Sequence, residues 1–467
     1  MKSVALHNLG CKVNSYELDV MQQFLQKEGY EIVDFSQKAD IYIINTCTVT
    51  NIADRKSRQM IHRAKKQNPD AVVVAVGCYV QTAEASIEND PYIDLAIGNN
   101  RKKEIVSIVE EFLRRRELVQ TEGDKTLSGT TIPDIAQEKE YEEMQLSHTA
   151  EHTRAYIKVQ DGCNQFCSYC VIPYARGRVR SRRPEHVLSE IHALVEAGYR
   201  EVVLTGIHLS SYGLDFRGES YNENREMRKD TDEKEQPDSS EDLLALIERV
   251  HEVEGITRIR LGSLEPRIVT EDFARRLSGM QKVCPHFHLS LQSGSDTVLK
   301  RMNRRYTCEE FAEGVRILRK YFEQPAITTD VITGFPGETE EEFKQTTEFL
   351  KKIRFFEMHV FPYSRREGTV AASMPGQLTE KEKKKRSAVL LEMDRTYSCA
   401  YRREHVGKVL PVLFEQTQEI GGVTYYVGHT QNYLKVAVLS EENIINREIM
   451  CSLEDMIDDE TLFAQKN

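Results

Sequence analysis

The sequence predicts a multidomain α/β protein with a doubly wound N-terminal α/β domain, a central partial (β/α)6 barrel and a small C-terminal β-barrel. Three observations predict this fold class. Aliphatic runs alternate with helical patterns near the N-terminus, six strand-like segments recur in the middle, and glycine-punctuated strands follow near the C-terminus. The chain has 467 residues and is 40% hydrophobic, which is enough to bury several cores.

The N-terminal domain is predicted over residues 1–116. Asn14, with Glu17 three residues later, resembles a capping box for a helix that Gly29 ends. Residues 117–148 are polar and unpatterned, and we predict a linker there. The strands of this domain are predicted at three aliphatic runs, Val4 to Leu9, Ile41 to Ile44 and Val72 to Val76.

The central domain is predicted over residues 149–378. Its six strand-like segments alternate with helical stretches, which predicts parallel strands with right-handed crossovers in an open or closed barrel. Residues 215–241 are charged and polar, and we predict a surface insertion there. The six segments are Tyr156 to Gln160, Val202 to Thr205, Arg258 to Gly262, His286 to Leu291, Thr328 to Ile332 and Met358 to Pro362.

The C-terminal domain is predicted over residues 379–452, and residues 453–467 are predicted to be a tail. A charged helix from about Thr379 to Glu404 leads into short strands separated by glycine, which predicts a small closed β domain. The strands are Val409 to Glu415, Thr424 to Val427 and Leu434 to Val438.

Composition excludes several classes of protein. The formal net charge of -11 argues against a protein that coats nucleic acid indiscriminately. The longest aliphatic run, Ala71 to Val76, is far shorter than the roughly 20 residues of a membrane-spanning helix, and no signal-peptide pattern is present. Ten cysteines are too few for a disulfide scaffold in so long a chain. We therefore expect a soluble protein of the reducing cytoplasm.

Three cysteines form a tight group in the segment DGCNQFCSYC. Cys163, Cys167 and Cys170 follow the first predicted barrel strand, at the end of a barrel where active sites lie. Three thiolates can hold three corners of a [4Fe-4S] cluster and leave the fourth iron open to a ligand. The alternatives are a chance grouping or a zinc site, but structural zinc takes four ligands and no fourth Cys or His follows at standard spacing.

Three further cysteines are far apart in the sequence. Cys11, Cys47 and Cys78 each follow an aliphatic strand, and the carboxyl ends of parallel strands lie at one edge of a sheet. We therefore favour a second three-cysteine cluster over the alternative, which is three buried thiols that act as small hydrophobic side chains. The cysteines without such a context are interpreted as structural: Cys284, Cys308, Cys399 and Cys451.

The whole chain resembles the radical S-adenosylmethionine (SAM) methylthiotransferase family. The motifs that carry the resemblance are NLGCKVNSYE, NTCTVT, VGCYVQ, DGCNQFCSYCVIPYARGRVRSR, LSLQSGSDTVLKRMNRRYT, DVITGFPGETEEEF and FPYSRREGT. The GCKVN motif and the GHTQNY segment resemble the branch that acts on N6-threonylcarbamoyladenosine in tRNA. His208 departs from the pattern, since a smaller or amide residue is commoner there.

The resemblance implies a cofactor set and a reaction. It implies two [4Fe-4S] clusters and SAM, which would be both methyl donor and radical source, with an electron donor such as flavodoxin or ferredoxin. Cys163, Cys167 and Cys170 would be catalytic, and Cys11, Cys47 and Cys78 would hold the cluster that delivers the methylated sulfur. The product would be 2-methylthio-N6-threonylcarbamoyladenosine, 3′-adjacent to the anticodon. The cofactor-binding residues would be Tyr169, Thr205, Gly206 and Gln292.

A dense basic run follows Cys170. Guanidinium groups bind phosphate in bidentate fashion, so we predict that this run contacts tRNA, with ordinary surface solvation as the alternative. The C-terminal β domain resembles an RNA-binding TRAM module. The predicted RNA-binding residues are Arg176, Arg178, Arg180, Arg182 and Arg183.

Two classes of alternative function stay open at this stage. One is methylthiolation of a different target, either isopentenyladenosine in tRNA or an aspartate of a ribosomal protein. The other is a non-catalytic iron-sulfur sensor that binds RNA, which detection of 5′-deoxyadenosine would exclude.

Overall fold

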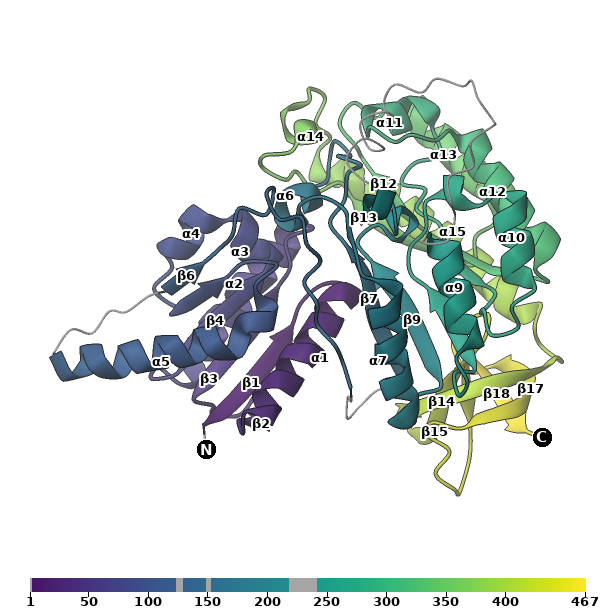
Figure 1. Ribbon diagram of the computed structural model, residues 1–467. Helices are drawn as coiled ribbons and strands as arrows, with labels where there is room; N and C mark the ends of the chain where they lie inside the picture. The colour runs from purple at the N-terminus through teal and green to yellow at the C-terminus, as the bar shows by residue number, and fades with distance from the viewer. Residues whose placement is uncertain (1, 123–128, 148–152, 218–241) are drawn as a thin grey trace.

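The computed structural model describes residues 2–122, 129–147, 153–217 and 242–467. Figure 1 shows an N-terminal α/β unit beside a central unit of strands covered by helices, with a small β unit at one end of the central strands. In the described part of the chain, no helix is both long enough and apolar enough to cross a membrane.

The N-terminal unit is a six-stranded parallel sheet in the order β2-β1-β3-β4-β5-β6. Every residue of β3 and β4 is buried, as expected for central strands with helices on both faces. The three predicted strands are confirmed. The strands are β1 (Ser3–Asn8), β2 (Glu31–Val33), β3 (Ile41–Thr46), β4 (Val72–Gly77), β5 (Leu95–Ile97) and β6 (Gly129–Thr131), and the helices are α1 (Lys12–Lys27), α2 (Asn51–Gln67), α3 (Cys78–Thr82), α4 (Glu84–Glu88) and α5 (Ile105–Glu122).

The predicted linker at 117–148 is wrong for much of its length. Helix α5 continues to Glu122, and β6 adds the last strand to the sheet by pairing with β5. Met144 and Leu146 are buried between the first two units, where the Tyr16 hydroxyl donates to Met144 O at 2.5 Å. The described residues of this segment, 117–122 and 129–147, therefore belong to the packed fold.

The central unit contains the six predicted parallel strands. β7, β9 and β10 pair in one sheet, β11, β12 and β13 pair in another, and parallel bridges such as Leu264 to Leu289 connect the two. The fourth strand is shorter than the predicted His286 to Leu291. The strands are β7 (Arg154–Asp161), β8 (Arg180–Ser181), β9 (Glu201–Gly206), β10 (Arg258–Leu261), β11 (His286–His288), β12 (Ala326–Thr333) and β13 (Glu357–Pro362).

Helices of the central unit connect these strands along the chain. The predicted insertion at 215–241 falls mostly outside the described residues, and only Asp215–Arg217 is described, as a short 3-10 helix. The helices are α6 (Ile172–Arg176), α7 (Pro184–Glu196), α9 (Leu243–Glu252), α10 (Glu271–Ser278), α11 (Asp296–Arg301), α12 (Cys308–Tyr321), α13 (Glu340–Ile353), α14 (Val370–Ser373) and α15 (Glu380–Arg403).

The C-terminal unit is a closed barrel in the order β14-β15-β16-β18-β17. The predicted tail at 453–467 is wrong, because β17 and β18 supply two of the five strands and β16 pairs with β18. The strands are β14 (Val409–Ile420), β15 (Val423–Thr430), β16 (Lys435–Val438), β17 (Glu448–Met456) and β18 (Thr461–Lys466).

Buried arginines join this barrel to the starts of the central strands. Arg258 donates to His429 O at 2.8 Å and Pro411 O at 3.0 Å, and Arg260 donates to Thr430 O at 3.0 Å. The C-terminal barrel therefore covers the N-terminal ends of the central strands, and the opposite, carboxyl ends are left for the candidate active site (Figure 1).

Candidate active site

The loop after β7 carries the first cysteine group. Cys163 N donates to Gly177 O at 3.0 Å, Ser168 N donates to Met302 O at 3.0 Å, and Cys170 N donates to Cys167 O at 2.9 Å. The loop is therefore fixed by backbone bonds to two other segments of the central unit. The three thiols lie at the carboxyl end of the strand, as the sequence predicts.

Two N–H groups point at the sulfur atoms of this loop. Gln165 N donates to Cys163 Sγ at 3.5 Å, and Arg304 Nη1 donates to Cys167 Sγ at 3.2 Å. Burial raises the pKa of Cys163 and of Cys170 to about 12. Without metal, Cys163 and Cys170 therefore keep their protons at neutral pH, and metal binding must release them. Arg304 received no role from the sequence, although it stands in the quoted motif KRMNRRYT.

Gly162 is required by the path of this loop. Its φ is +70°, and a Cβ there would lie 1.8 Å from Arg178 O. We expect Gly162→Ala to displace the loop and to remove the iron bound by Cys163, Cys167 and Cys170. Gly198→Ala is the matched control, since its φ is +94° and no atom lies within 4 Å of the added Cβ. The control should cost about 1–2 kcal/mol of stability and keep its iron, and equal iron content in both variants would contradict the prediction.

The second cysteine group gathers at the carboxyl edge of the N-terminal sheet. Cys11 precedes α1, Cys47 follows β3 and Cys78 begins α3. Cys47 lies near the other two thiols, since burial, followed by the neighbouring Cys78 and Cys11 thiols, raises the pKa of Cys47 to about 12. A Cβ at Gly10 would lie 2.9 Å from Cys47 Sγ, so this glycine leaves room beside the sulfur.

The sulfur atoms of neither cysteine group lie as close together as a single bound zinc ion would hold them. With Zn–S bonds of about 2.3 Å, tetrahedral geometry places sulfur atoms about 3.8 Å apart. Within the described residues, neither cysteine group has its three sulfur atoms all within 4.8 Å of one another. Each group offers three thiols, the number that holds a [4Fe-4S] cluster with one open iron.

A buried guanidinium connects the two groups. Arg176 Nε donates to Cys78 Sγ at 3.3 Å, and Arg176 Nη1 donates to Glu17 at 2.8 Å and to Asp161 at 3.1 Å. Asp161 Oδ1 in turn accepts from Gly162 N at 2.8 Å, directly before Cys163. Arg176 therefore touches a ligand of one group and the loop that carries the other.

This arrangement corrects two predictions. Asn14 and Glu17 do not cap α1, because Asn14 donates to Leu9 O and Thr46 O and Glu17 bonds three cations. The prediction of RNA contact is wrong for three arginines of the basic run, which are at most 1% exposed and pair with buried carboxylates: Arg176, Arg180 and Arg182.

The other two arginines of the run are exposed, and their contact with RNA stays a prediction. Arg178 lies over the Phe166 ring at 4.6 Å, and Arg183 lies over the Phe216 ring at 4.3 Å. Exposure therefore separates the members of one basic run into interior and surface residues.

The four predicted cofactor-binding residues lie near the cysteine loop or at carboxyl ends of strands. Thr205 and Gly206 end β9, and Gln160 on β7 pairs with Gly206. Gln292 has a φ of +69°, and its N donates to Asp330 O at 2.8 Å. Tyr169 lies in the loop itself, where burial, followed by the neighbouring Cys167, raises its pKa. No contact tests their role, so these assignments stay predictions.

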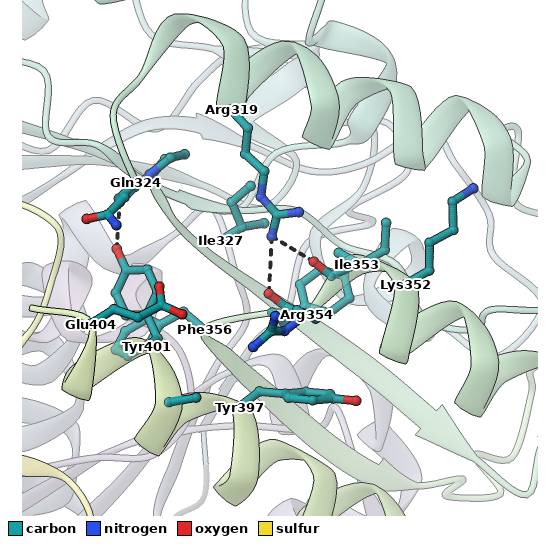
Figure 2. A pocket seen from close by; sticks show the side chains of 13 residues that line it. Arg319, Gln324, Ile327, Lys352, Ile353, Arg354, Phe356, Tyr397, Tyr401 and Glu404 are labelled. Atoms are coloured by element: carbon teal, nitrogen blue, oxygen red, sulfur yellow. Dashed lines mark hydrogen bonds between the residues drawn. The ribbon is translucent and has the colours of Figure 1, made fainter.

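A pocket of about 390 Å³ lies away from both cysteine groups, among α12, α13, β12 and α15 (Figure 2). Its central cation is used structurally, because Arg319 donates to Ile353 O at 2.7 Å and Arg354 O at 3.1 Å, at the C-terminal end of α13. The Tyr401 hydroxyl donates to Gln324 O at 2.7 Å. Arg319 therefore caps the C-terminal end of α13.

Two family models match the chain. The radical SAM superfamily matches residues 157–350, and Uncharacterized protein family UPF0004 matches residues 3–98. Among solved structures, the radical SAM methyltransferase TsrM from Kitasatospora setae has a TM-score of 0.54 and 18% identity, and the alignment covers 79% of this chain and 77% of that chain. This likeness concerns the fold.

Curated relatives extend the similarity over nearly the whole chain. The threonylcarbamoyladenosine tRNA methylthiotransferase MtaB of Bacillus subtilis is 40% identical over 451 residues, which cover 96% of this chain and 92% of that protein. MtaB of Aquifex aeolicus is 38% identical, with coverage of 93% and 98%. The tRNA-2-methylthio-N(6)-dimethylallyladenosine synthase of Moorella thermoacetica is 35% identical, with coverage of 89% and 87%. With its two converging cysteine groups, this chain is a member of the radical SAM methylthiotransferase family.

Proposed function

We propose that this enzyme methylthiolates C2 of N6-threonylcarbamoyladenosine 3′-adjacent to the anticodon of tRNA, giving 2-methylthio-N6-threonylcarbamoyladenosine. The observation that carries the proposal is the contact of Arg176 with Cys78 Sγ, which brings the two cysteine groups to one junction. Substrate choice rests on the relatives, since the proteins with 40% and 38% identity are named for threonylcarbamoyladenosine.

The two cysteine groups would have different functions in the reaction, one in SAM cleavage and the other in sulfur delivery. When bound, the cluster on Cys163, Cys167 and Cys170 supplies the electron for cleavage of SAM, and the cluster on Cys11, Cys47 and Cys78 supplies the sulfur. Arg304 donates to Cys167 Sγ and orients that ligand. We assign Tyr169, Thr205, Gly206 and Gln292 to SAM binding. At the second site Cys47 and Cys78 are buried, whereas Cys11 is exposed.

The partners follow from the same proposal. We infer that tRNA is the substrate, that a flavodoxin or ferredoxin donates electrons, and that the protein acts in the cytoplasm. We further infer that the C-terminal barrel is an RNA-binding TRAM domain, in keeping with the oligonucleotide binding of other small closed barrels. That barrel lies at the N-terminal ends of the central strands, so it would contact tRNA away from the target base.

The nucleoside profile of tRNA from a deletion strain tests the substrate. We expect 2-methylthio-N6-threonylcarbamoyladenosine to disappear and its unmodified precursor to accumulate, and plasmid-borne wild-type protein should restore the product. The second candidate substrate is the dimethylallyl (isopentenyl) adenosine named for the Moorella thermoacetica relative. Loss of its 2-methylthio form, with the threonylcarbamoyl product unchanged, would replace the proposed substrate.

A further inference from the structure

A cavity of about 730 Å³ lies between the N-terminal unit and the central unit. Its lining includes residues that closely follow three of the cysteine ligands, since Asn51 follows Cys47, Tyr79 follows Cys78 and Val171 follows Cys170. α2, α3 and α6 meet in this region (Figure 1). The volume lies within the range of about 300–1,000 Å³ that small-ligand sites occupy. The cavity is therefore large enough for a nucleotide and adjoins both cysteine groups.

An exposed aromatic ring lines this cavity. Tyr174 on α6 is 51% exposed, and its ring meets Phe166 edge to face with centroids 5.9 Å apart. Phe166 has a φ of +47°, an uncommon conformation for a bulky residue, and Asn303 Nδ2 donates to its carbonyl oxygen at 3.0 Å. The loop is thus held so that Phe166 supports Tyr174, and such strained positions cluster at functional sites.

The lining carries an excess of positive charge. Three arginines, Arg58, Arg365 and Arg366, face two acids, Asp54 and Glu367, which leaves a net charge of +1. Arg366 is buried and pairs with Asp54 at 2.6 Å, whereas Arg58 and Arg365 are exposed. The two exposed guanidinium groups are therefore placed to bind an anion, and guanidinium matches phosphate in bidentate geometry.

We propose that this cavity binds a nucleotide of the anticodon loop that flanks the target adenosine, with its base on Tyr174 and its phosphate at Arg58 and Arg365. The inference rests on the proposed function and deepens it. An enzyme that acts on a base must take that base out of the stack, so the neighbouring base loses a partner as well. An aromatic ring replaces that partner for any base, because every base has a π-face.

The test uses full-length, cluster-loaded protein and a synthetic anticodon stem-loop with 2-aminopurine beside the target adenosine. We expect Tyr174→Ala to raise the Kd about tenfold and to remove the change in 2-aminopurine fluorescence on binding, whereas Tyr174→Phe keeps both close to wild type. Arg58→Gln and Arg365→Gln should each lower the slope of log Kd against log salt by about 1. Arg275→Gln is the matched control, because Arg275 is an exposed arginine that pairs with Asp272 within its own helix, α10.

Each outcome decides the proposal. Unchanged Kd, fluorescence and salt slope in the Tyr174 and arginine variants would overturn the proposal. A raised KM for the flavodoxin-type reductant with unchanged RNA binding would also overturn it, because that result would assign this surface to a protein partner. If Tyr174→Ala also loses RNA-independent SAM cleavage, the two arginine variants decide. Failure of the proposed function is seen separately, as absence of the methylthiolated nucleoside with wild-type protein.

Discussion

Cys47→Ala is expected to abolish formation of the methylthiolated nucleoside while SAM is still cleaved to 5′-deoxyadenosine. Cys47 belongs to the group on the N-terminal sheet, whereas the ligands assigned to SAM cleavage lie on the loop after β7. Both products can be measured by mass spectrometry in one anaerobic reaction with stem-loop RNA. Protein-bound iron should fall to about half, since one of two three-cysteine sites loses a ligand.

Two further variants make this result specific. Cys163→Ala should lose both products, because the nucleoside product requires SAM cleavage. Cys284→Ala is the matched control, since Cys284 is a buried free cysteine of the central unit that belongs to neither group, and it should keep both products. Loss of 5′-deoxyadenosine in folded Cys47→Ala protein would contradict the division of labour between the two groups.

The positions of the two cysteine groups at the carboxyl ends of strands could be predicted, because the sequence carries both their local spacing and their place after buried strands, and their role as cluster ligands stays a prediction. The strands themselves were predictable where aliphatic runs were four residues or longer, as at Ile41 to Ile44 and Val72 to Val76. The strands that the sequence did not predict in the N-terminal sheet are β2, β5 and β6, which have three residues each. Each is defined by pairing with a neighbouring strand, as β6 is by pairing with β5. Tertiary context, which local patterns do not contain, decided these elements.

The buried arginines of the candidate site could not be predicted from local sequence patterns either. A run of alternating arginines is usually a solvated surface, but Arg176 finds its carboxylate partner Glu17 159 positions earlier in the chain. Because no local pattern connects residues so far apart, the sequence could not indicate that Arg176 is buried. The same holds for Arg304, whose partner sulfur on Cys167 is 137 positions away.

Glu17→Gln is expected to destabilise the protein by about 3–5 kcal/mol, since it leaves buried cations without their carboxylate. Glu17 is 1% exposed and contacts Lys102, Lys158 Nζ at 2.9 Å and Arg176 Nη1 at 2.8 Å. Without it, Lys158 and Arg176 keep Asp161 as a partner, and Lys102 loses its ion-pair partner at the junction of the two units. Chemical unfolding of anaerobic, cluster-loaded protein, followed by circular dichroism, measures the loss. Glu111→Gln, which breaks an exposed helical pair with Arg115, is the control and should leave stability unchanged.

The free energy of unfolding at acid pH provides an independent check of the role of Glu17. Burial acts to raise the pKa of Glu17, but Arg176, Lys102 and Lys158 outweigh it and hold the pKa well below its usual value. A carboxyl whose pKa is depressed on folding stabilises the protein above its unfolded pKa of about 4.3 and loses that contribution as pH falls. Wild-type protein should therefore lose stability below about pH 4.3 more steeply than Glu17→Gln. Parallel curves for the two proteins, or an equal loss of stability in Glu111→Gln, would show that Glu17 does not hold the junction together.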